Sequence, residues 1–214
     1  MRQKRYAQAM AALIVLALTI AFVDRPLALF VYWYARPVRA PFIFVTHIID
    51  VLEVLALITL ATSVWSLSKG RALDGWKDAA FRASLSLFIA SGVKDTLKIA
   101  FGRTWPETWV AQNPSFIRDG VFGFWPLHGG VGWSAFPSGH TTLIFAVAAC
   151  LWPLLPRFRA IYAGLALLCG FSLVAANYHW LSDVLAGAII GTLIGSLMAR
   201  LNLPACSRLA LESK

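Results

Sequence analysis

A chain of 214 residues in which 59% are hydrophobic and only 14% are charged has more apolar surface than a soluble domain of its length can bury. Together with a mean hydropathy of +0.69, this composition excludes a water-soluble enzyme and predicts an integral membrane protein. The net charge of +9 does not indicate nucleic-acid binding, because the basic residues lie in short segments between apolar runs. Basic residues in that position orient helices and contact anionic membrane lipids, so no nucleic-acid partner is expected.

Six apolar runs follow one another along the chain, each near or somewhat beyond the ~20 residues that a helix needs to cross a bilayer. A helix satisfies its own backbone hydrogen bonds in lipid and an open sheet does not, so the sequence predicts an all-α integral membrane protein. We expect six transmembrane helices in one bundle, and a single domain over residues 1–214. The predicted helices cover residues 7–23, 42–67, 79–101, 140–156, 160–178 and 180–200.

The first apolar run follows the basic segment MRQKR and in this respect resembles a signal peptide. No small-residue cleavage site in clear context follows it, so we interpret the run as an uncleaved first helix that ends at Asp24-Arg25-Pro26. The only long connection is at 102–137, which is rich in Gly, Pro and Trp. Long ordered loops often carry function, so this loop is a candidate part of a functional site.

Lys and Arg residues predict the orientation of the bundle. They are more numerous in the N-terminal and C-terminal segments and in the connections at 68–78 and 156–159 than on the other side of the membrane. By the positive-inside rule, both termini are predicted to lie in the cytoplasm. The loop at 102–137 is then predicted to face outward.

Three groups of polar residues lie where lipid would exclude them without a purpose. Counting the predicted helices brings all three groups to the outer membrane face, although they are far apart in the sequence. They are KDTLK at 94–98 with Gly102 and Arg103, PSGHTT at 137–142, and His179 with Asp183.

Two of these polar groups contain a histidine, and the two histidines together would suit phosphoryl transfer. His179 and Asp183 are four residues apart and share a helix face, so the carboxylate fixes the tautomer of the imidazole and leaves its other nitrogen free to attack. His140 is a second titratable group near neutral pH, suited to acid–base catalysis. The cysteines are Cys150, Cys169 and Cys206. They form no metal-ligand pattern or disulfide framework, and we expect neither a metal nor a cofactor.

The other polar residues of the three groups suit an anion. Ser138 and Gly139 begin a predicted helix, whose free N–H groups and positive dipole end favour a phosphate. Lys98 and Arg103 add cationic donors. Together these residues predict a phosphate-binding site beside the two histidines.

PSGH at 137–140 followed by His-x-x-x-Asp at 179–183, in this order on six apolar helices, resembles the type 2 phosphatidic acid phosphatase superfamily. The resemblance covers about residues 80–195. It implies that His179, oriented by Asp183, attacks phosphorus and forms a phosphohistidine, and that His140 protonates the leaving group and then activates water. It also implies that the phosphoryl oxygens are bound by Lys98, Ser138 and Gly139.

The resemblance implies a metal-independent membrane phosphatase that hydrolyses a lipid phosphomonoester or pyrophosphate at the outer face of the bacterial cytoplasmic membrane. Candidate substrates are phosphatidic acid, phosphatidylglycerol phosphate, undecaprenyl diphosphate and a lipid A phosphate, and the sequence does not choose among them. Two alternatives remain: a lipid phosphotransferase that uses the same phosphohistidine, and an inactive homologue that binds a lipid phosphate. The sequence does not predict the oligomeric state.

The chain departs from the family pattern at two positions. The first motif has an arginine seven residues after its lysine, where this chain has Trp105, and Arg103 is the nearest substitute. The third motif begins with Ser-Arg, but here Ser172 is followed by Leu173. Two positive groups that stabilise phosphoryl oxygens are therefore missing from their usual positions.

Further polar residues are candidates for substrate contact. Lys94, Arg118 and Asn177 are candidates to replace the missing arginines. We expect His128 in the long loop to be a surface histidine, and most of the loop tryptophans to form an interfacial belt. The second predicted helix carries a group that is either a substrate contact or a polar network, namely His47, Asp50 and Glu53.

Overall fold

A computed structural model describes residues 2–201, except for the side chains of Arg2 and Arg5, and this part of the chain contains helices and no β-strand. The prediction of an all-α protein is confirmed for these residues, and each of the six predicted runs coincides with one helix or with consecutive helices. The α-helices are α1 (Arg2–Leu18), α2 (Asp24–Phe30), α3 (Ala40–Thr46), α4 (Ile48–Ser68), α5 (Gly75–Phe101), α6 (Phe116–Asp119), α7 (Gly139–Leu154), α8 (Arg159–Ala175) and α9 (Leu181–Arg200). Shorter π and 3₁₀ turns are η1 (Thr19–Val23), η2 (Val31–Ala35), η3 (Arg36–Val38), η4 (Val131–Trp133) and η5 (Pro156–Phe158).

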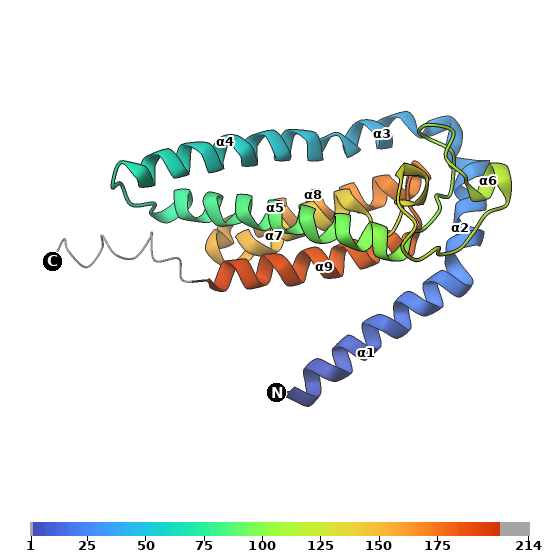
Figure 1. The fold of residues 1–214 in the computed structure, drawn as a ribbon, viewed down its shortest axis with the longest axis horizontal. Helices are drawn as coiled ribbons and strands as arrows, with labels where there is room; N and C mark the ends of the chain where they lie inside the picture. Colours follow the sequence, from blue (N-terminus) through green and yellow to red (C-terminus); the bar gives the residue numbers. More distant parts are fainter. Residues whose placement is uncertain (1, 202–214) are drawn as a thin grey trace.

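The first helix does not end at Asp24-Arg25-Pro26, so that prediction is wrong. The chain stays helical from α1 through the π-turn η1 into α2, and the Asp24 N–H donates to the Thr19 carbonyl across this turn. The π-turn changes the hydrogen-bond pattern just before Pro26, so the proline bends the helix and does not terminate it. As a result, α1 leans away from the bundle and α2 runs along the bundle end that carries α6 (Figure 1).

Three glycines spaced one helical turn apart let α9 lie directly against the backbone of α7. A Cβ atom on Gly187 would lie 2.7 Å from the Ser138 carbonyl oxygen, and Cβ atoms on Gly191 and Gly195 would overlap the carbonyl oxygens of α7. Small residues at helix contacts permit this close approach inside a membrane. The contact brings the first turn of α9, and the segment before it, next to the start of α7.

Helix α5 lies on another side of α7 and ends at the same level. The buried Ser86 hydroxyl of α5 donates to the Ala146 carbonyl of α7 over 3.1 Å. Gly102 ends α5 with a positive φ of 56°, and a Cβ there would overlap the backbone of Trp125. Only glycine fits this position, because the long loop returns across it and the Trp125 N–H donates to the Gly102 carbonyl. The loop therefore covers the end of the bundle at which α5 stops and α7 begins (Figure 1).

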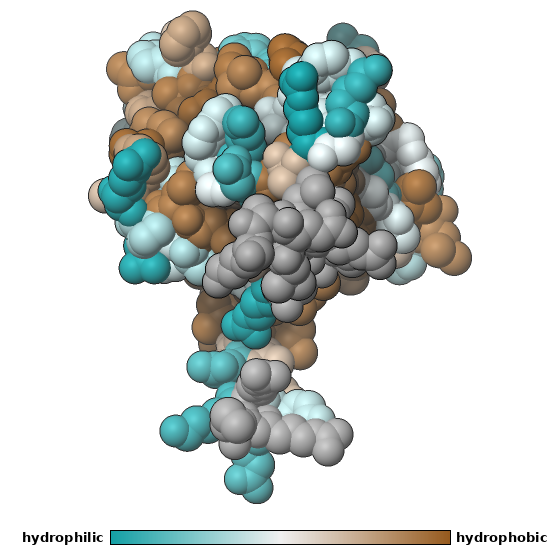
Figure 2. All heavy atoms as spheres, turned by 90° about the vertical axis from the view of Figure 1, so that its left-hand side faces the viewer, coloured by the Kyte–Doolittle hydropathy of each residue, from teal (hydrophilic) through white to brown (hydrophobic). Residues whose placement is uncertain are grey.

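The surface of the bundle suits a membrane. Within residues 2–201, four helical stretches are long and apolar enough to cross a bilayer, and α7 is a shorter apolar helix. Many large apolar side chains of these helices point outward, as lipid-facing residues do. Seen from the end that carries the α4–α5 turn, separate hydrophilic groups lie among hydrophobic areas (Figure 2). That all six predicted runs cross the membrane stays a prediction. The four stretches are Tyr6–Val38, Ala40–Ser68, Pro156–Ala175 and Leu181–Arg200.

Candidate active site

A cavity of about 320 Å³ opens at the loop-covered end of the bundle and contains residues from all three predicted polar groups. Lys98 reaches it from the end of α5, Gly139 and His140 from the start of α7, and His179 from the segment before α9. The rest of its wall is aromatic or aliphatic. These other lining residues are Trp105, Trp109, Val110, Leu173 and Tyr178.

His179 is held against a carboxylate. Its Nδ1 lies 3.4 Å from Oδ2 of Asp183, and the same oxygen accepts the Trp180 N–H over 3.1 Å at the first turn of α9. A carboxylate only accepts hydrogen bonds, so the proton lies on Nδ1 and Nε2 keeps the lone pair. Burial lowers the pKa of His179 below its ordinary value of 6.5, and the hydrogen bond and the charge of Asp183 offset only part of this effect. His179 is therefore a neutral imidazole with one nitrogen available to attack.

The start of α7 provides a place for an anion beside His179. A Cβ on Gly139 would lie 3.7 Å from the Lys98 ammonium nitrogen and 3.2 Å from the aliphatic stem of Lys94. Gly139 thus leaves the backbone N–H groups at this helix end close to a lysine and open to a small anion. The Lys98 nitrogen also lies 5.9 Å from the centre of the Trp105 ring, within range of a cation–π interaction.

Ser138, which we expected to bind phosphate, does not line the cavity. Its side chain is fully buried, and its hydroxyl oxygen accepts from the N–H and the hydroxyl of Thr141. Its own N–H donates to the carbonyl of Asp183 over 3.0 Å. Ser138 therefore caps α7 and joins it to α9, because a serine at this position satisfies a backbone donor that the helix leaves free.

Both positions where the family motifs have an arginine lie in the cavity wall. Trp105 and Leu173 line the cavity, and the Trp105 ring centre lies 5.0 Å from that of His179. Trp109 and Tyr178 add an edge-to-face aromatic pair, with ring centres 4.1 Å apart. Lys98 is consequently the only Lys or Arg among the described lining residues, and apolar surface occupies the positions of the missing guanidinium groups.

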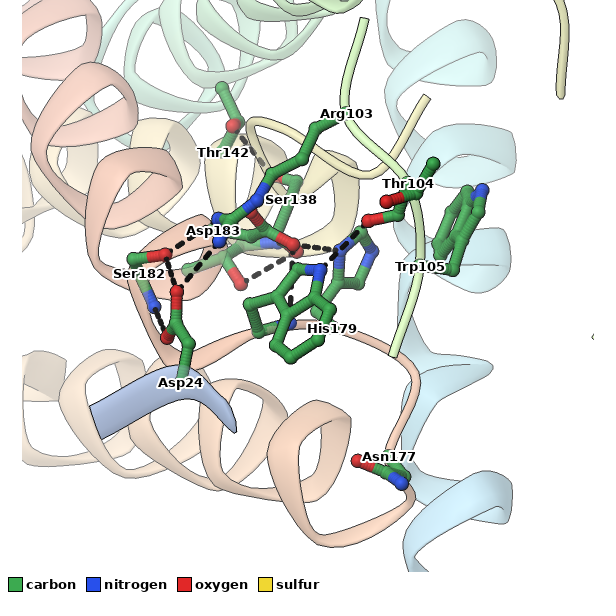
Figure 3. Close-up of polar contacts among 12 residues, drawn as sticks. Asp24, Arg103, Thr104, Trp105, Ser138, Thr142, Asn177, His179, Ser182 and Asp183 are labelled. Carbon is green, nitrogen blue, oxygen red and sulfur yellow. Dashed lines mark hydrogen bonds and ion pairs between the residues drawn. The ribbon is translucent and has the colours of Figure 1, made fainter. Parts of the chain in front are cut away.

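Arg103 differs from its predicted role as a phosphate ligand. It is fully buried and does not line the cavity. Its guanidinium bridges two buried carboxylates, donating to Asp183 over 2.5 Å and to Asp24 over 2.7 Å (Figure 3). It also donates to the Ser182 hydroxyl over 2.6 Å. All of these partners are protein groups, so Arg103 does not replace the positive charge missing at position 105.

The remaining predicted contacts also lie outside the cavity lining. The Lys94 ammonium pairs with Asp95 over 2.7 Å, and the Arg118 guanidinium bonds acceptors within the long loop. Asn177 donates to the Ala28 carbonyl and to Glu107, away from the cavity. On the second predicted helix, His47 pairs with Asp50 over 2.9 Å at an exposed position, and Glu53 lies one turn further along.

Sequence reasoning missed Asp24 as a site residue. It lies beside Pro26, and we interpreted the pair as the end of the first helix. The usable signal was an acidic residue directly after a long apolar run, since a charge at that depth normally has a partner. The partner of Asp24 was not predictable, because Arg103 follows the predicted helix at 79–101, and the sequence does not show that these two helix ends meet.

Comparison with known proteins shows the family of the chain. Residues 79–204 match the PAP2 superfamily, and this match covers more than half of the chain. The chain belongs to the PAP2 superfamily. The matched segment contains Lys98, His140, His179 and Asp183. Asp24 and the first two predicted helices lie outside it.

Three curated relatives carry the name lipid A 1-phosphatase. The protein of Rhizobium etli is 36% identical over 95 residues, which are 44% of this chain and 38% of the relative. That of Rhizobium johnstonii is 35% identical over 103 residues, 48% of this chain and 39% of the relative. That of Porphyromonas gingivalis is 29% identical over 134 residues, 60% of this chain and 25% of the relative. The match thus spans at most about two fifths of the length of these relatives.

A solved structure shares the fold. It is the transmembrane PAP2-type phosphatidylglycerolphosphate phosphatase of Bacillus subtilis, with a TM-score of 0.52 and 15% sequence identity. The alignment covers 88% of this chain and 92% of that one, so most of the described helical bundle shares its architecture with that protein. Within residues 2–201, no group of three or more His, Cys, Asp or Glu is arranged to hold a metal ion.

Proposed function

We propose that the protein is a membrane phosphatase that hydrolyses a lipid phosphate through a phosphohistidine at His179, without a metal ion. The observation that carries the proposal is one cavity that holds a neutral His179 backed by Asp183, together with Lys98, Gly139 and His140. Nucleophile, acid–base group and phosphate donors are the groups that this reaction needs.

The first step transfers the phosphoryl group to the protein. Nε2 of His179 attacks phosphorus, the bond from phosphorus to the lipid oxygen breaks, and protonated His140 gives its proton to the leaving oxygen. Asp183 supports the positive charge that develops on the His179 ring. Lys98 and the N–H groups at the start of α7 stabilise the non-bridging oxygens.

The second step releases inorganic phosphate. Neutral His140 takes a proton from water, the water oxygen attacks phosphorus, and the phosphorus–nitrogen bond breaks with its electron pair returning to Nε2 of His179. The proton now on His140 is the one that the next leaving group receives. His140 therefore acts as acid and then as base, and both histidines end in their starting states.

The orientation and the number of spanning helices belong to this proposal. The cavity lies at the end of the bundle away from the basic α4–α5 and α7–α8 turns, which supports an extracytoplasmic site in the bacterial cytoplasmic membrane, with six spanning helices and both termini inside. The basic residues Arg208 and Lys214, which contributed to that prediction, lie outside the described residues.

For the substrate we favour a single phosphomonoester over a diphosphate. Among the described lining residues Lys98 is the only Lys or Arg, and a second phosphate would meet Trp105, Trp109 or Leu173 instead of a cation. The three relatives named lipid A 1-phosphatase make a lipid A phosphate the first substrate to test. Trp105 and Leu173 also favour one second candidate, a homologue that binds a lipid phosphate and does not turn it over.

The test is phosphate release by the purified full chain in detergent with EDTA, using lipid A, phosphatidic acid, phosphatidylglycerol phosphate and undecaprenyl diphosphate. His179→Ala is expected to abolish release on every lipid. The matched control is His128→Ala, because His128 is exposed in the loop and lies against Trp133, outside the cavity lining. A wild type that binds a lipid phosphate and releases none would establish the binding homologue. An active His179→Ala variant would refute the phosphohistidine.

A further inference from the structure

The carboxylate behind His179 belongs to a larger buried network that begins on the first helix (Figure 3). The side chains of Asp24, Arg103 and Asp183 are each 0% exposed. Arg103 stands between the two carboxylates, with one terminal nitrogen on each. The first helix thus contacts the candidate active site through the Arg103 guanidinium and through Ser182, the neighbour of Asp183.

We propose that Asp24 is a positioning residue for catalysis, which acts through Arg103 to set the position and charge of the Asp183 carboxylate behind His179. The proposal rests on the function proposed above. It adds a part of the active site from outside residues 79–204, the segment that matches the family.

The two carboxylate oxygens of Asp183 have different hydrogen-bond partners. Oδ1 accepts from Arg103, while Oδ2 faces Nδ1 of His179 and the N–H of Trp180. The position of the guanidinium therefore decides how the carboxylate is rotated toward the histidine. A rotated carboxylate would hold the wrong tautomer or the wrong ring orientation, because the imidazole takes both from this hydrogen bond.

Asp24 in turn holds the guanidinium. It accepts from one terminal nitrogen of Arg103, and its two oxygens also accept from the N–H and the hydroxyl of Ser182, over 3.0 and 2.5 Å. Within the described residues, the Nε of Arg103 has no hydrogen-bond partner. Only the two terminal nitrogens therefore fix the guanidinium by hydrogen bonding, and Asp24 holds one of them.

Asp24 also shares the positive charge of Arg103. With two carboxylates on one guanidinium, neither carboxylate is fully neutralised, and Asp183 keeps negative charge to support a positive His179 ring. If Asp24 lost its charge, Arg103 would pair with Asp183 alone and weaken that support. A planar fork with two terminal nitrogens can bridge two carboxylates in this way, and a lysine cannot.

The experiment compares Asp24→Asn with wild type in the phosphate-release assay, with kcat and KM measured separately. Asparagine keeps the size of the side chain and one acceptor oxygen, so it removes mainly the charge. We expect kcat to fall by about 10- to 100-fold, the range for residues that orient a reacting group, with KM within about threefold. The matched control is Asp74→Asn, an exposed carboxylate at the opposite end of α5, which should leave both constants unchanged.

A double-mutant cycle with Arg103→Gln tests whether the effect of Asp24 on catalysis passes through Arg103. If Asp24 acts through Arg103, Asp24→Asn lowers kcat by less than about twofold once Arg103 is already glutamine, because the two losses are not additive for residues in one network. Losses that multiply would overturn the proposal. So would an Asp24→Asn variant that has wild-type kcat and only a lower melting temperature, because Asp24 would then merely anchor the first helix.

Arg103→Lys keeps the proposal testable if Asp24→Asn does not fold. Lysine retains the charge but lacks the two terminal nitrogens that hold Asp24 and Asp183 in their present positions. We therefore expect kcat to fall while KM is retained, and a wild-type kcat would overturn the proposal. His179→Ala in the same assay separates the positioning role of Asp24 from the proposed phosphatase function. If wild type is active and depends on His179 but Asp24 has no effect on kcat, only the positioning role fails. If activity does not depend on His179, the proposed function itself fails.

Discussion

The contact between α7 and α9 predicts that one added methyl group impairs catalysis more than folding. In Gly187→Ala the new Cβ would lie 2.7 Å from the Ser138 carbonyl oxygen, 3.0 Å from the Thr142 hydroxyl and 3.1 Å from Thr141. An ordinary contact begins at 3.4 Å, so the first turns of α9 must move away from α7 by about 0.7 Å. Because a 1 Å misplacement costs roughly 100-fold in rate, kcat should fall by about 10- to 100-fold.

The assay is phosphate release with kcat, KM and melting temperature measured in the same detergent. Gly164→Ala is the matched control, because a Cβ on Gly164 in α8 meets nothing within 4 Å. Gly195→Ala is the second control: it introduces a more severe clash, with the Ala146 carbonyl oxygen, on the same face of α9 but two turns further from the cavity. It should therefore lower the melting temperature more than Gly187→Ala does, with a smaller loss of kcat. If folded Gly187→Ala has the kcat of Gly164→Ala, the α7–α9 contact does not set the catalytic geometry.

Four further predictions concern the cavity. Burial lowers the pKa of His179 below 6.5, so the nucleophile should stay neutral as the pH falls to that value. In a pH profile of kcat/KM, the loss of activity on the acid side should therefore occur below pH 6.5. A loss that occurs above pH 6.5 would contradict this prediction. The same shift predicts a stability contribution that is present above pH 6.5 and is lost as the pH falls further, because the unfolded histidine takes up its proton first. Lys98→Ala should lower kcat/KM by roughly 10² to 10³, as loss of an oxyanion donor does. Initial rates of phosphate release measure this ratio, and a variant with wild-type kcat/KM would show that Lys98 does not stabilise the phosphoryl oxygens. Trp105→Arg should raise kcat/KM for a lipid diphosphate, relative to kcat/KM for the corresponding monoester, by about 10-fold, which is the value of one charged hydrogen bond. If the ratio of the two kcat/KM values stays unchanged, the missing cation at position 105 does not cause a preference for monoesters.

Much of the candidate site was predictable from the sequence. The apolar runs indicated helices, because helix length and lipid exposure are local properties of composition. Counting those helices brought Lys98, His140 and His179 to one end of the bundle, and the structure has all three in one cavity. The same motif spacing singled out Trp105 and Leu173, and both line that cavity.

The network behind His179 was not predictable in this way. Asp24 and Pro26 have the local features of a helix end, and only the π-turn before them keeps the helix continuous. Arg103 has the local features of a phosphate ligand, yet packing buries it between two carboxylates. A buried cation pairs with whichever acceptors the packed helices bring within about 3 Å, and that choice depends on contacts between distant segments. The sequence by itself therefore determined which histidines and which lysine are candidates for the chemistry, and at which end of the bundle they meet. Only the tertiary structure decided which of the basic residues remains in the cavity and which one joins the first helix to Asp183.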